Sequence, residues 1–135
     1  MNVLQFLTPK SKTAYLETDD TIRQGLEKMR YHGYSALPVV DPKNGTFVGT
    51  VREGDFLRLL LDMDMPELSE LENVSLMDIV RKDNPGVNVS APLEVLLDRI
   101  QDNNFVPVTD DRGCYIGIVT RKAVIGYFAS RYLFK

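Results

Sequence analysis

The chain has 135 residues, 44% of them hydrophobic and 26% charged, which is the composition of a folded globular protein rather than a disordered one. Its formal net charge of −3 argues against a general nucleic-acid-binding protein, because such proteins need a basic face. The single cysteine, Cys114, excludes an internal disulfide, and the sequence shows neither a secretion signal nor an apolar run of membrane-spanning length. We therefore expect a cytoplasmic protein with no membrane or nucleic-acid partner.

The first half of the chain predicts alternating strands and helices. Ile22, Leu26 and Met29 recur at the spacing of one helix face, and the pair Asn44-Gly45 is a strong signal for a hairpin turn. In chain order we expect a lead-in helical turn at 3–7, a strand at 13–17, a helix at 21–31, strands at 37–40 and 47–51, and a leucine-rich helix at about 55–63.

The second half of the chain repeats this pattern. Pro38 and Pro107 stand 69 residues apart within matching apolar-Pro-Val-x-Asp segments, and Gly49 and Gly117 stand 68 residues apart within matching apolar-Gly-x-Val segments. The elements predicted for this copy are a lead-in turn at 76–80, a strand at 87–89, a helix at 93–102, strands around Pro107 and Gly117, and a helix from Thr120 to about Leu133. The chain then divides into repeat 1 at 1–65, a connector at 66–74 and repeat 2 at 75–135.

This duplicated signature resembles the CBS motif, and the chain is similar to a minimal tandem CBS pair, also called a Bateman module. The resemblance covers almost the whole chain. It implies an α/β (α+β) fold of two strand-helix-strand-strand-helix repeats related by a pseudo-twofold axis. It also implies a regulatory module, commonly a homodimer, that senses adenosine-containing ligands and has no catalysis of its own.

An enzymatic function has little support in the sequence. The phosphate-loop, GxGxxG, HExxH and GxSxG motifs are all absent. The chain has one histidine, His32, and one cysteine, which leaves few nucleophile–base pairs and no cluster with metal-ligand spacing. We expect no catalytic residues, no metal and no cofactor other than a regulatory nucleotide.

In the family that the chain resembles, adenine nucleotides bind in clefts between the two copies. Thr120, Arg121 and Lys122 stand where a strand passes into a helix, so free N–H groups, the positive end of the helix dipole and two cations favour a phosphate there. Tyr34 is suited to stack on a base, and Ser35 to bind the edge of adenine. Carried over by position, the resemblance assigns to this cleft Lys12, Thr13, Ala14, Tyr15, Tyr34, Ser35, Ala36, Thr120, Arg121 and Lys122.

A second, weaker cleft follows from the same resemblance. Asp55 would accept hydrogen bonds from both hydroxyls of a free ribose, and Arg52 would reach a phosphate, although Glu53 opposes an anion. The residues assigned to this cleft are Arg52, Asp55, Val87, Asn88, Asn104, Phe105 and Val106.

The sequence departs from the family pattern in both copies of a Ser/Thr-x-x-Asp motif. Arg52 replaces the Ser or Thr in the first copy, and Ala123 replaces the ribose-binding Asp in the second. In this respect the chain is similar to stand-alone CBS proteins of Gram-positive bacteria that bind cyclic di-AMP, with Lys122 where those proteins have a second Arg. Cyclic di-AMP and the mononucleotides AMP, ADP and ATP both stay open as ligands. NAD-type ligands and S-adenosylmethionine are further options, but the latter carries no phosphate for the basic turn.

Simpler interpretations exist for the same residues. Arg121 and Lys122 also suit a solvated helix start, Asp55 a helix cap, and Tyr34 surface packing. The alternative function is a ligand-free CBS module that acts on an unidentified effector protein through dimerisation and protein contacts alone. The side chains that crowd the C-terminus, some of them expected in a dimer contact, are Tyr127, Phe128, Tyr132, Leu133 and Phe134.

Overall fold

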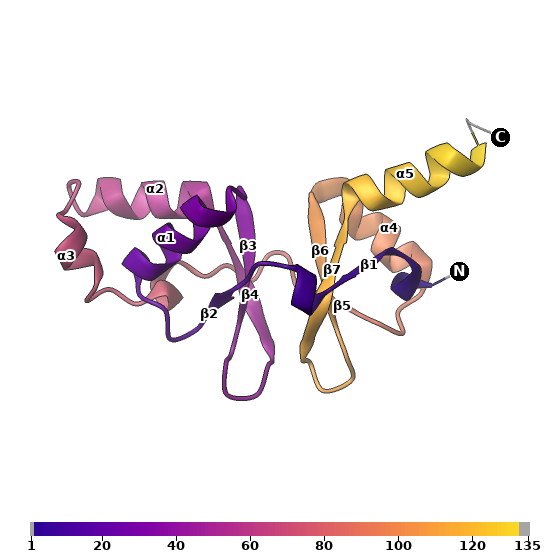
Figure 1. Cartoon of the computed structure of the whole chain (residues 1–135), viewed down its shortest axis with the longest axis horizontal. Helices are drawn as coiled ribbons and strands as arrows, with labels where there is room; N and C mark the ends of the chain where they lie inside the picture. Colours follow the sequence, from indigo (N-terminus) through magenta and orange to yellow (C-terminus); the bar gives the residue numbers. More distant parts are fainter. Residues whose placement is uncertain (1, 133–135) are drawn as a thin grey trace. The chain divides into compact units, whose positions relative to one another are not determined.

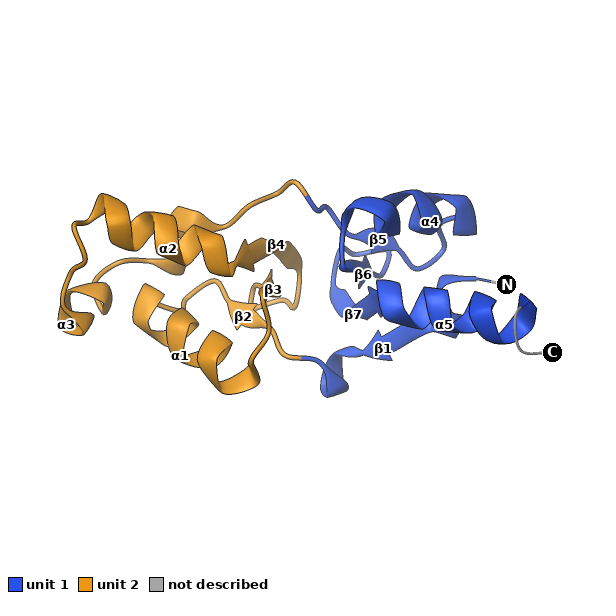
Figure 2. Ribbon diagram, turned by 90° about the horizontal axis from the view of Figure 1, so that it is seen from above, with its two compact units in different colours: residues 1–13, 84–135 blue, residues 14–83 orange. Residues whose placement is uncertain are grey.

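The computed structural model describes residues 2–132, which form two compact units (Figure 2). The first-repeat unit consists of residues 14–83, and the second-repeat unit consists of residues 1–13 together with 84–135. Their mixed helices and strands confirm the predicted fold class. Leu133 and Phe134, which the sequence placed at the end of the last helix, lie outside the described residues. Within residues 2–132, no helix is long and apolar enough to cross a membrane.

The first-repeat unit has a three-stranded sheet in the order β2-β3-β4, with β2 parallel and β4 antiparallel to β3. Its helix α1 begins after Thr21, whose side chain accepts a hydrogen bond from the backbone N–H of Gln24, and ends at Gly33 in the left-handed conformation. The elements of this unit are β2 (Leu16–Glu17), α1 (Ile22–His32), β3 (Ala36–Val40), β4 (Phe47–Arg52), α2 (Glu53–Asp62), α3 (Leu68–Leu71) and the 3₁₀ helix η3 (Leu76–Ile79) (Figure 1).

The core of this unit lies between α1, α2 and the sheet. Ile22 and Met29 are buried, which confirms the predicted apolar face of α1, and Leu16 of β2 is fully buried beneath them. The other buried members of this core are Leu37, Val39, Val51, Phe56, Leu71 and Leu76. Helix α2 starts two residues before its predicted position, because the backbone turns directly from β4 into the helix at Arg52.

The second-repeat unit has a four-stranded sheet in the order β1-β7-β6-β5. Its elements are the 3₁₀ helix η1 (Val3–Phe6), β1 (Leu7–Pro9), the 3₁₀ helix η2 (Lys10–Lys12), β5 (Val87–Asn88), α4 (Leu93–Asp102), β6 (Phe105–Thr109), β7 (Tyr115–Thr120) and α5 (Arg121–Tyr132). Its buried core consists of Val3, Phe6, Val87, Leu96, Ile100, Val106, Val108, Val119 and Val124.

The N-terminal strand β1 is the main feature that the sequence did not predict. It pairs antiparallel with β7, with Leu7 opposite Val119. The predicted strand at 13–17 is reduced to the two residues of β2, and η2 precedes it. In the first-repeat unit the segment after η3 takes the corresponding edge position, because Arg81 and Thr50 exchange two backbone hydrogen bonds of 2.9 Å. Each sheet is therefore extended by the lead-in segment of the other repeat.

Two glycines permit this edge pairing. A Cβ atom on Gly49 would collide with the carbonyl oxygen of Arg81, and one on Gly117 would collide with the carbonyl oxygen of Thr8. Gly117 also has a φ of 152°, which side chains other than glycine rarely adopt. The repeated apolar-Gly-x-Val motif thus marks the strand against which each lead-in segment lies.

Candidate functional site

An open pocket of about 500 Å³ lies at the N-terminus of α5 in the second-repeat unit. Thr120 ends β7 and caps the helix, since its hydroxyl oxygen accepts a 3.0 Å hydrogen bond from the backbone N–H of Ala123. The backbone N–H of Arg121 donates to the carbonyl oxygen of Asn104 at 2.8 Å, which holds the start of β6 beside the start of α5. The pocket is lined by Asn104, Thr120, Arg121, Lys122, Ile125 and Gly126.

The charges at this helix start favour an anion. The first turn of α5 has no acidic residue and contains both Arg121 and Lys122, and the helix dipole adds to their positive charge. The start of α2 in the first-repeat unit is the opposite case, because Glu53 and Asp55 lie in its first turn. Of the two helix starts that follow a hairpin, only that of α5 is therefore suited to bind phosphate. No group of acidic, histidine or cysteine side chains in residues 2–132 is arranged to hold a metal ion.

Arg121 is oriented by the end of helix α4. Its Nε donates to the carbonyl oxygen of Ile100 at 3.0 Å, and one of its terminal nitrogens donates to that of Gln101 at 3.1 Å. These bonds place a cation at the negative end of α4, which stabilises the helix, and they hold the guanidinium at the wall of the pocket. A guanidinium has N–H groups beyond those used in these two bonds, so the same side chain has donors for an anion.

The other residues of the predicted main cleft are divided between the units. Lys12 and Thr13 belong to the second-repeat unit, where the Thr13 hydroxyl lies 2.8 Å from that of Tyr115 and donates to the carbonyl oxygen of Lys10 at 2.9 Å. Ala14, Tyr15 and residues 34–36 belong to the first-repeat unit. Their participation in one site with Thr120, Arg121 and Lys122 stays a prediction.

Tyr34 lies in an exposed aromatic cluster of the first-repeat unit. Its ring, 52% exposed, stacks near His32 with centroids 6.2 Å apart, and Tyr31 meets the same histidine edge-on. The carbonyl oxygen of Ser35 accepts a hydrogen bond from the backbone N–H of Glu53 at 2.9 Å. About half of the Tyr34 surface is therefore exposed, as base stacking would require.

Within each unit, the turn after the first α-helix (α1 or α4) lies beside the start of the helix that follows the hairpin (α2 or α5), because the backbone N–H of Glu53 donates to Ser35 and that of Arg121 donates to Asn104. Asn104 therefore contributes to the same pocket as Thr120, whereas the sequence assigned the two residues to different clefts. Ile125 and Gly126 also line the pocket, although the sequence did not predict them as site residues. The available signal was their position one helical turn after Arg121 and Lys122.

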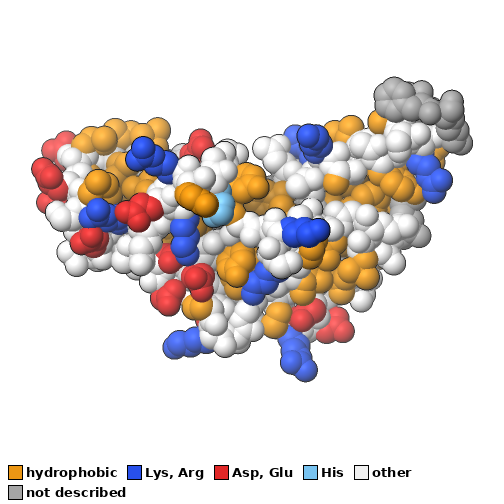
Figure 3. Space-filling model, in the orientation of Figure 1, with side chains coloured by type: hydrophobic (Ala, Val, Ile, Leu, Met, Phe, Trp, Pro, Cys, Tyr) orange, Lys and Arg blue, Asp and Glu red, His pale blue; other side chains and the backbone are white. Residues whose placement is uncertain are grey.

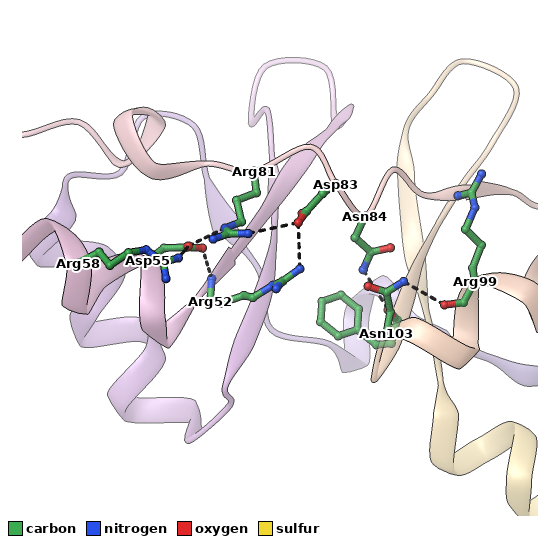
Figure 4. A network of polar contacts seen from close by, with 9 residues as sticks. Arg52, Asp55, Arg58, Arg81, Asp83, Asn84, Arg99 and Asn103 are labelled. Atoms are coloured by element: carbon green, nitrogen blue, oxygen red, sulfur yellow. Dashed lines mark hydrogen bonds and ion pairs between the residues drawn. The ribbon is translucent and has the colours of Figure 1, made fainter.

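The residues of the predicted second cleft in the first-repeat unit are engaged in an ion-pair network (Figure 4). The side chain of Asp55 is only 5% exposed and accepts hydrogen bonds from Arg81 Nε at 2.6 Å, from an Arg58 terminal nitrogen at 2.7 Å and from the backbone N–H of Arg52 at 2.9 Å. Asp83 in turn accepts from Arg52 and from Arg81, both at 3.2 Å. The hydrogen bond and charge of Asp55 raise the pKa of Arg81 above its ordinary value. Arg52 and Asp55 thus have partners within the chain.

The remaining predicted residues of the second cleft have mainly structural surroundings. Val87 and Val106 belong to the core. Asn88 accepts from the backbone N–H of Ser90 at 2.7 Å and donates to Asp111 at 3.2 Å. The carbonyl oxygen of Phe105 accepts from the side chain of Asn84 at 3.1 Å.

Comparison with protein families identifies the architecture. The CBS domain model matches the chain twice, at residues 7–62 and 76–130. The chain belongs to the CBS domain family. This confirms the resemblance that the repeated proline and glycine motifs indicated.

Two curated relatives match the chain over most of its length. Cyclic di-AMP receptor B of Bacillus subtilis is 23% identical over 121 residues, which are 90% of this chain and 82% of that protein. An uncharacterized protein of Methanocaldococcus jannaschii is 29% identical over 106 residues, which are 73% of this chain and 37% of that protein. The chain thus spans most of the first relative and just over a third of the second.

Solved structures share the fold of two CBS repeats. The CbpB protein of Listeria monocytogenes in complex with c-di-AMP superposes with a TM-score of 0.86 at 22% identity, over 98% of this chain and 98% of that chain. CBSX2 in complex with AMP superposes with a TM-score of 0.74 at 27% identity, over 96% of this chain and 97% of that chain. The predicted fold is therefore confirmed along nearly the whole chain.

Proposed function

We propose that this protein is a non-catalytic, cytoplasmic regulatory module that binds cyclic di-AMP and passes the signal to a partner protein. The observation that carries the proposal is the pocket at the start of α5, where Arg121, Lys122 and the helix N-terminus favour a phosphate and no acidic side chain opposes it. The similarity to Cyclic di-AMP receptor B and to CbpB supports the choice of ligand class.

The residue at position 123 favours cyclic di-AMP over a mononucleotide. Ala123 occupies the third position of α5, as Asp55 occupies the third position of α2. The start of α5 therefore lacks the carboxylate that the resemblance to CBS modules assigns to the ribose hydroxyls. A ligand whose 3′-oxygen is part of a phosphodiester loses less from that absence than AMP does. The AMP-bound CBSX2 structure keeps AMP as the second candidate ligand.

A thermal-shift panel tests the proposed ligand. Cyclic di-AMP, AMP, ADP, ATP, S-adenosylmethionine, NAD and a guanine dinucleotide control are compared on the full chain. At about 100 times its Kd, a ligand that binds only the folded state stabilises it by about 2.7 kcal/mol, a shift of several degrees. We expect this shift with cyclic di-AMP and a smaller one with AMP. A shift with the mononucleotides alone would contradict the choice of ligand, and no shift with any compound would favour the ligand-free interaction module.

The exposed face of α2 and α3 supports self-association of the module. Leu57, Leu61, Met65 and Leu68 are between 55% and 63% exposed, and Figure 3 shows hydrophobic side chains gathered over α2. We name these four residues the α2–α3 apolar row. An exposed row of this kind is typical of a protein contact. Acidic side chains accompany it along the chain, namely Asp62, Asp64, Glu67 and Glu70.

Helix α5 has the complementary character. Helix α5 has no acidic residue, and beyond the pocket residues Arg121, Lys122 and Ile125 it carries the basic Arg131 in its last turn and exposes Tyr132. The acidic, apolar surface of α2–α3 in one copy therefore suits the basic, apolar surface of α5 in a second copy. The proposed assembly is a homodimer that uses this contact.

Replacing Leu61 by glutamate is expected to weaken the dimer by about 1.5–3 kcal/mol, the burial energy of one leucine side chain. Size-exclusion chromatography with light scattering measures the change across a range of protein concentrations. Leu4→Glu is the matched control, because Leu4 is 55% exposed on η1, outside the α2–α3 apolar row. A Leu61→Glu variant that dimerises like the wild type would contradict the proposed contact.

A further inference from the structure

The resemblance to CBS modules assigns Asp55 to the ribose hydroxyls of a nucleotide, yet in the structure its carboxylate is already paired. One oxygen accepts from both Arg58 and Arg81, and the other accepts from the backbone N–H of Arg52 (Figure 4). A carboxylate offers about four lone-pair positions, so three of them are used. The side chain is 5% exposed, which leaves hardly any surface for a further contact.

We propose that Arg58 and Arg81 are specificity-determining residues that keep Asp55 from binding ribose hydroxyls. The first-repeat unit then offers no ribose-binding carboxylate, and nucleotide binding relies on the pocket at the start of α5. This inference rests on the proposed nucleotide-binding function and sets its ligand class, because it selects against ligands that depend on a free ribose diol.

The position of Arg81 explains why a ligand does not simply displace it. Its backbone is held at the edge of β4 by two hydrogen bonds with Thr50, each 2.9 Å long. Its side chain contacts two carboxylates, with Nε on Asp55 and a terminal nitrogen on Asp83. A ribose that reached Asp55 with both hydroxyls would need two lone pairs, and so at least one arginine would have to leave a largely buried carboxylate.

The arginines of this network are not a spare phosphate site. Arg58 and Arg81 pair with Asp55, and Arg52 and Arg81 pair with Asp83. The five side chains contain two carboxylates against three guanidinium groups, so most of their positive charge is compensated locally. The network therefore acts on ligand choice through the Asp55 carboxylate, rather than by attracting an anion.

The decisive experiment is titration calorimetry of AMP on three forms of the full chain. The forms are the wild type, the double variant Arg58→Met/Arg81→Met, and the same double variant with Asp55→Asn added. We expect the double variant to bind AMP at least about tenfold more tightly than the wild type, the effect of one hydrogen bond to a charged group. Adding Asp55→Asn should remove that gain. A purely structural role for the arginines predicts no gain, and that result would overturn the proposal.

Asp55→Asn alone provides an independent test in the wild-type background. We expect it to lower the melting temperature, because a buried ion pair is lost, while the affinities for AMP and cyclic di-AMP stay within about twofold. A tenfold loss of AMP affinity in this variant would show that Asp55 binds ribose in the wild type, which would overturn the proposal.

If circular dichroism finds the double variant unfolded, Arg58→Met replaces it, because Arg58 is 61% exposed and its loss leaves Arg81 in place. A single variant without any gain in AMP affinity would then overturn the proposal.

The titrations also separate this inference from the proposed function. A wild type that binds neither cyclic di-AMP nor AMP contradicts the proposed function. Even in that case, the arginine variants still test the further inference. AMP binding that appears in the arginine variants and disappears when Asp55→Asn is added would show that the arginines block the carboxylate.

Discussion

Replacing Arg121 by alanine is expected to weaken the binding of cyclic di-AMP by about 1.5–3 kcal/mol, which is roughly a ten- to hundredfold rise in Kd. The guanidinium lines the pocket at the start of α5, and its bonds to the carbonyl oxygens of Ile100 and Gln101 hold it there in one orientation. An arginine that is already oriented loses little conformational entropy when it binds a phosphate, so its removal should cost most of a charge-assisted hydrogen bond. Titration calorimetry measures the change in Kd.

The same substitution also removes two bonds at the end of α4, so a loss of stability must be separated from a loss of binding. Arg99→Ala is the matched control. Arg99 donates to the carbonyl oxygens of Gly86 at 2.9 Å and Pro85 at 3.3 Å, in the same unit, but it does not line the pocket. Both variants should melt earlier than the wild type, and only Arg121→Ala should lose affinity. Equal affinities for Arg121→Ala and the wild type would remove Arg121 from the site.

Gly117→Ala should lower the free energy of unfolding by about 3 kcal/mol, measured by urea denaturation. Two causes act together. The added Cβ would collide with the carbonyl oxygen of Thr8, which is backbone and fixed by the pairing of β1 with β7, and alanine is strained at a φ of 152°. The added methyl group and the carbonyl oxygen of Thr8 can separate only if β1 moves away from β7, which breaks this edge pairing.

Gly126→Ala is the control for the loss of a glycine as such. Gly126 lies in α5 with no atom near its missing Cβ, so alanine should raise stability by up to about 1 kcal/mol through its higher helix propensity. Gly49→Ala should fall between the two, because it meets the carbonyl oxygen of Arg81 but has no positive φ. Unfolding of Gly117→Ala at the same urea concentration as the wild type would contradict the close approach of β1 to β7 at this glycine.

Local signals explain why most elements could be predicted. Helix α1 has its apolar spacing, its Thr21 cap and its terminal Gly33 within a few neighbouring residues, and the structure places its ends within one residue of the prediction. The match between Pro38 and Pro107 was sufficient to reveal the duplication and, through it, the family. Such patterns are properties of short segments, so one sequence contains them in full.

The candidate site was predicted in part. Thr120, Arg121 and Lys122 form one wall of a pocket as expected from a basic strand-to-helix turn, while Asn104 joins them from a segment assigned elsewhere. A side chain's partners depend on which segments meet in space. A local sequence pattern does not contain the information about which distant segments come together.

By itself the sequence determined the α/β class, the two repeats, the helices and hairpins within them, and the basic turn before α5. Only the tertiary structure decided that β1 extends the sheet of the opposite repeat and that Asp55 is paired with Arg81, 26 residues away. The physical reason is the separation along the sequence between the groups that interact. Helix caps, apolar faces and turns are set by residues within a few positions of one another, whereas edge pairing and buried ion pairs join groups that are brought together only when the core packs.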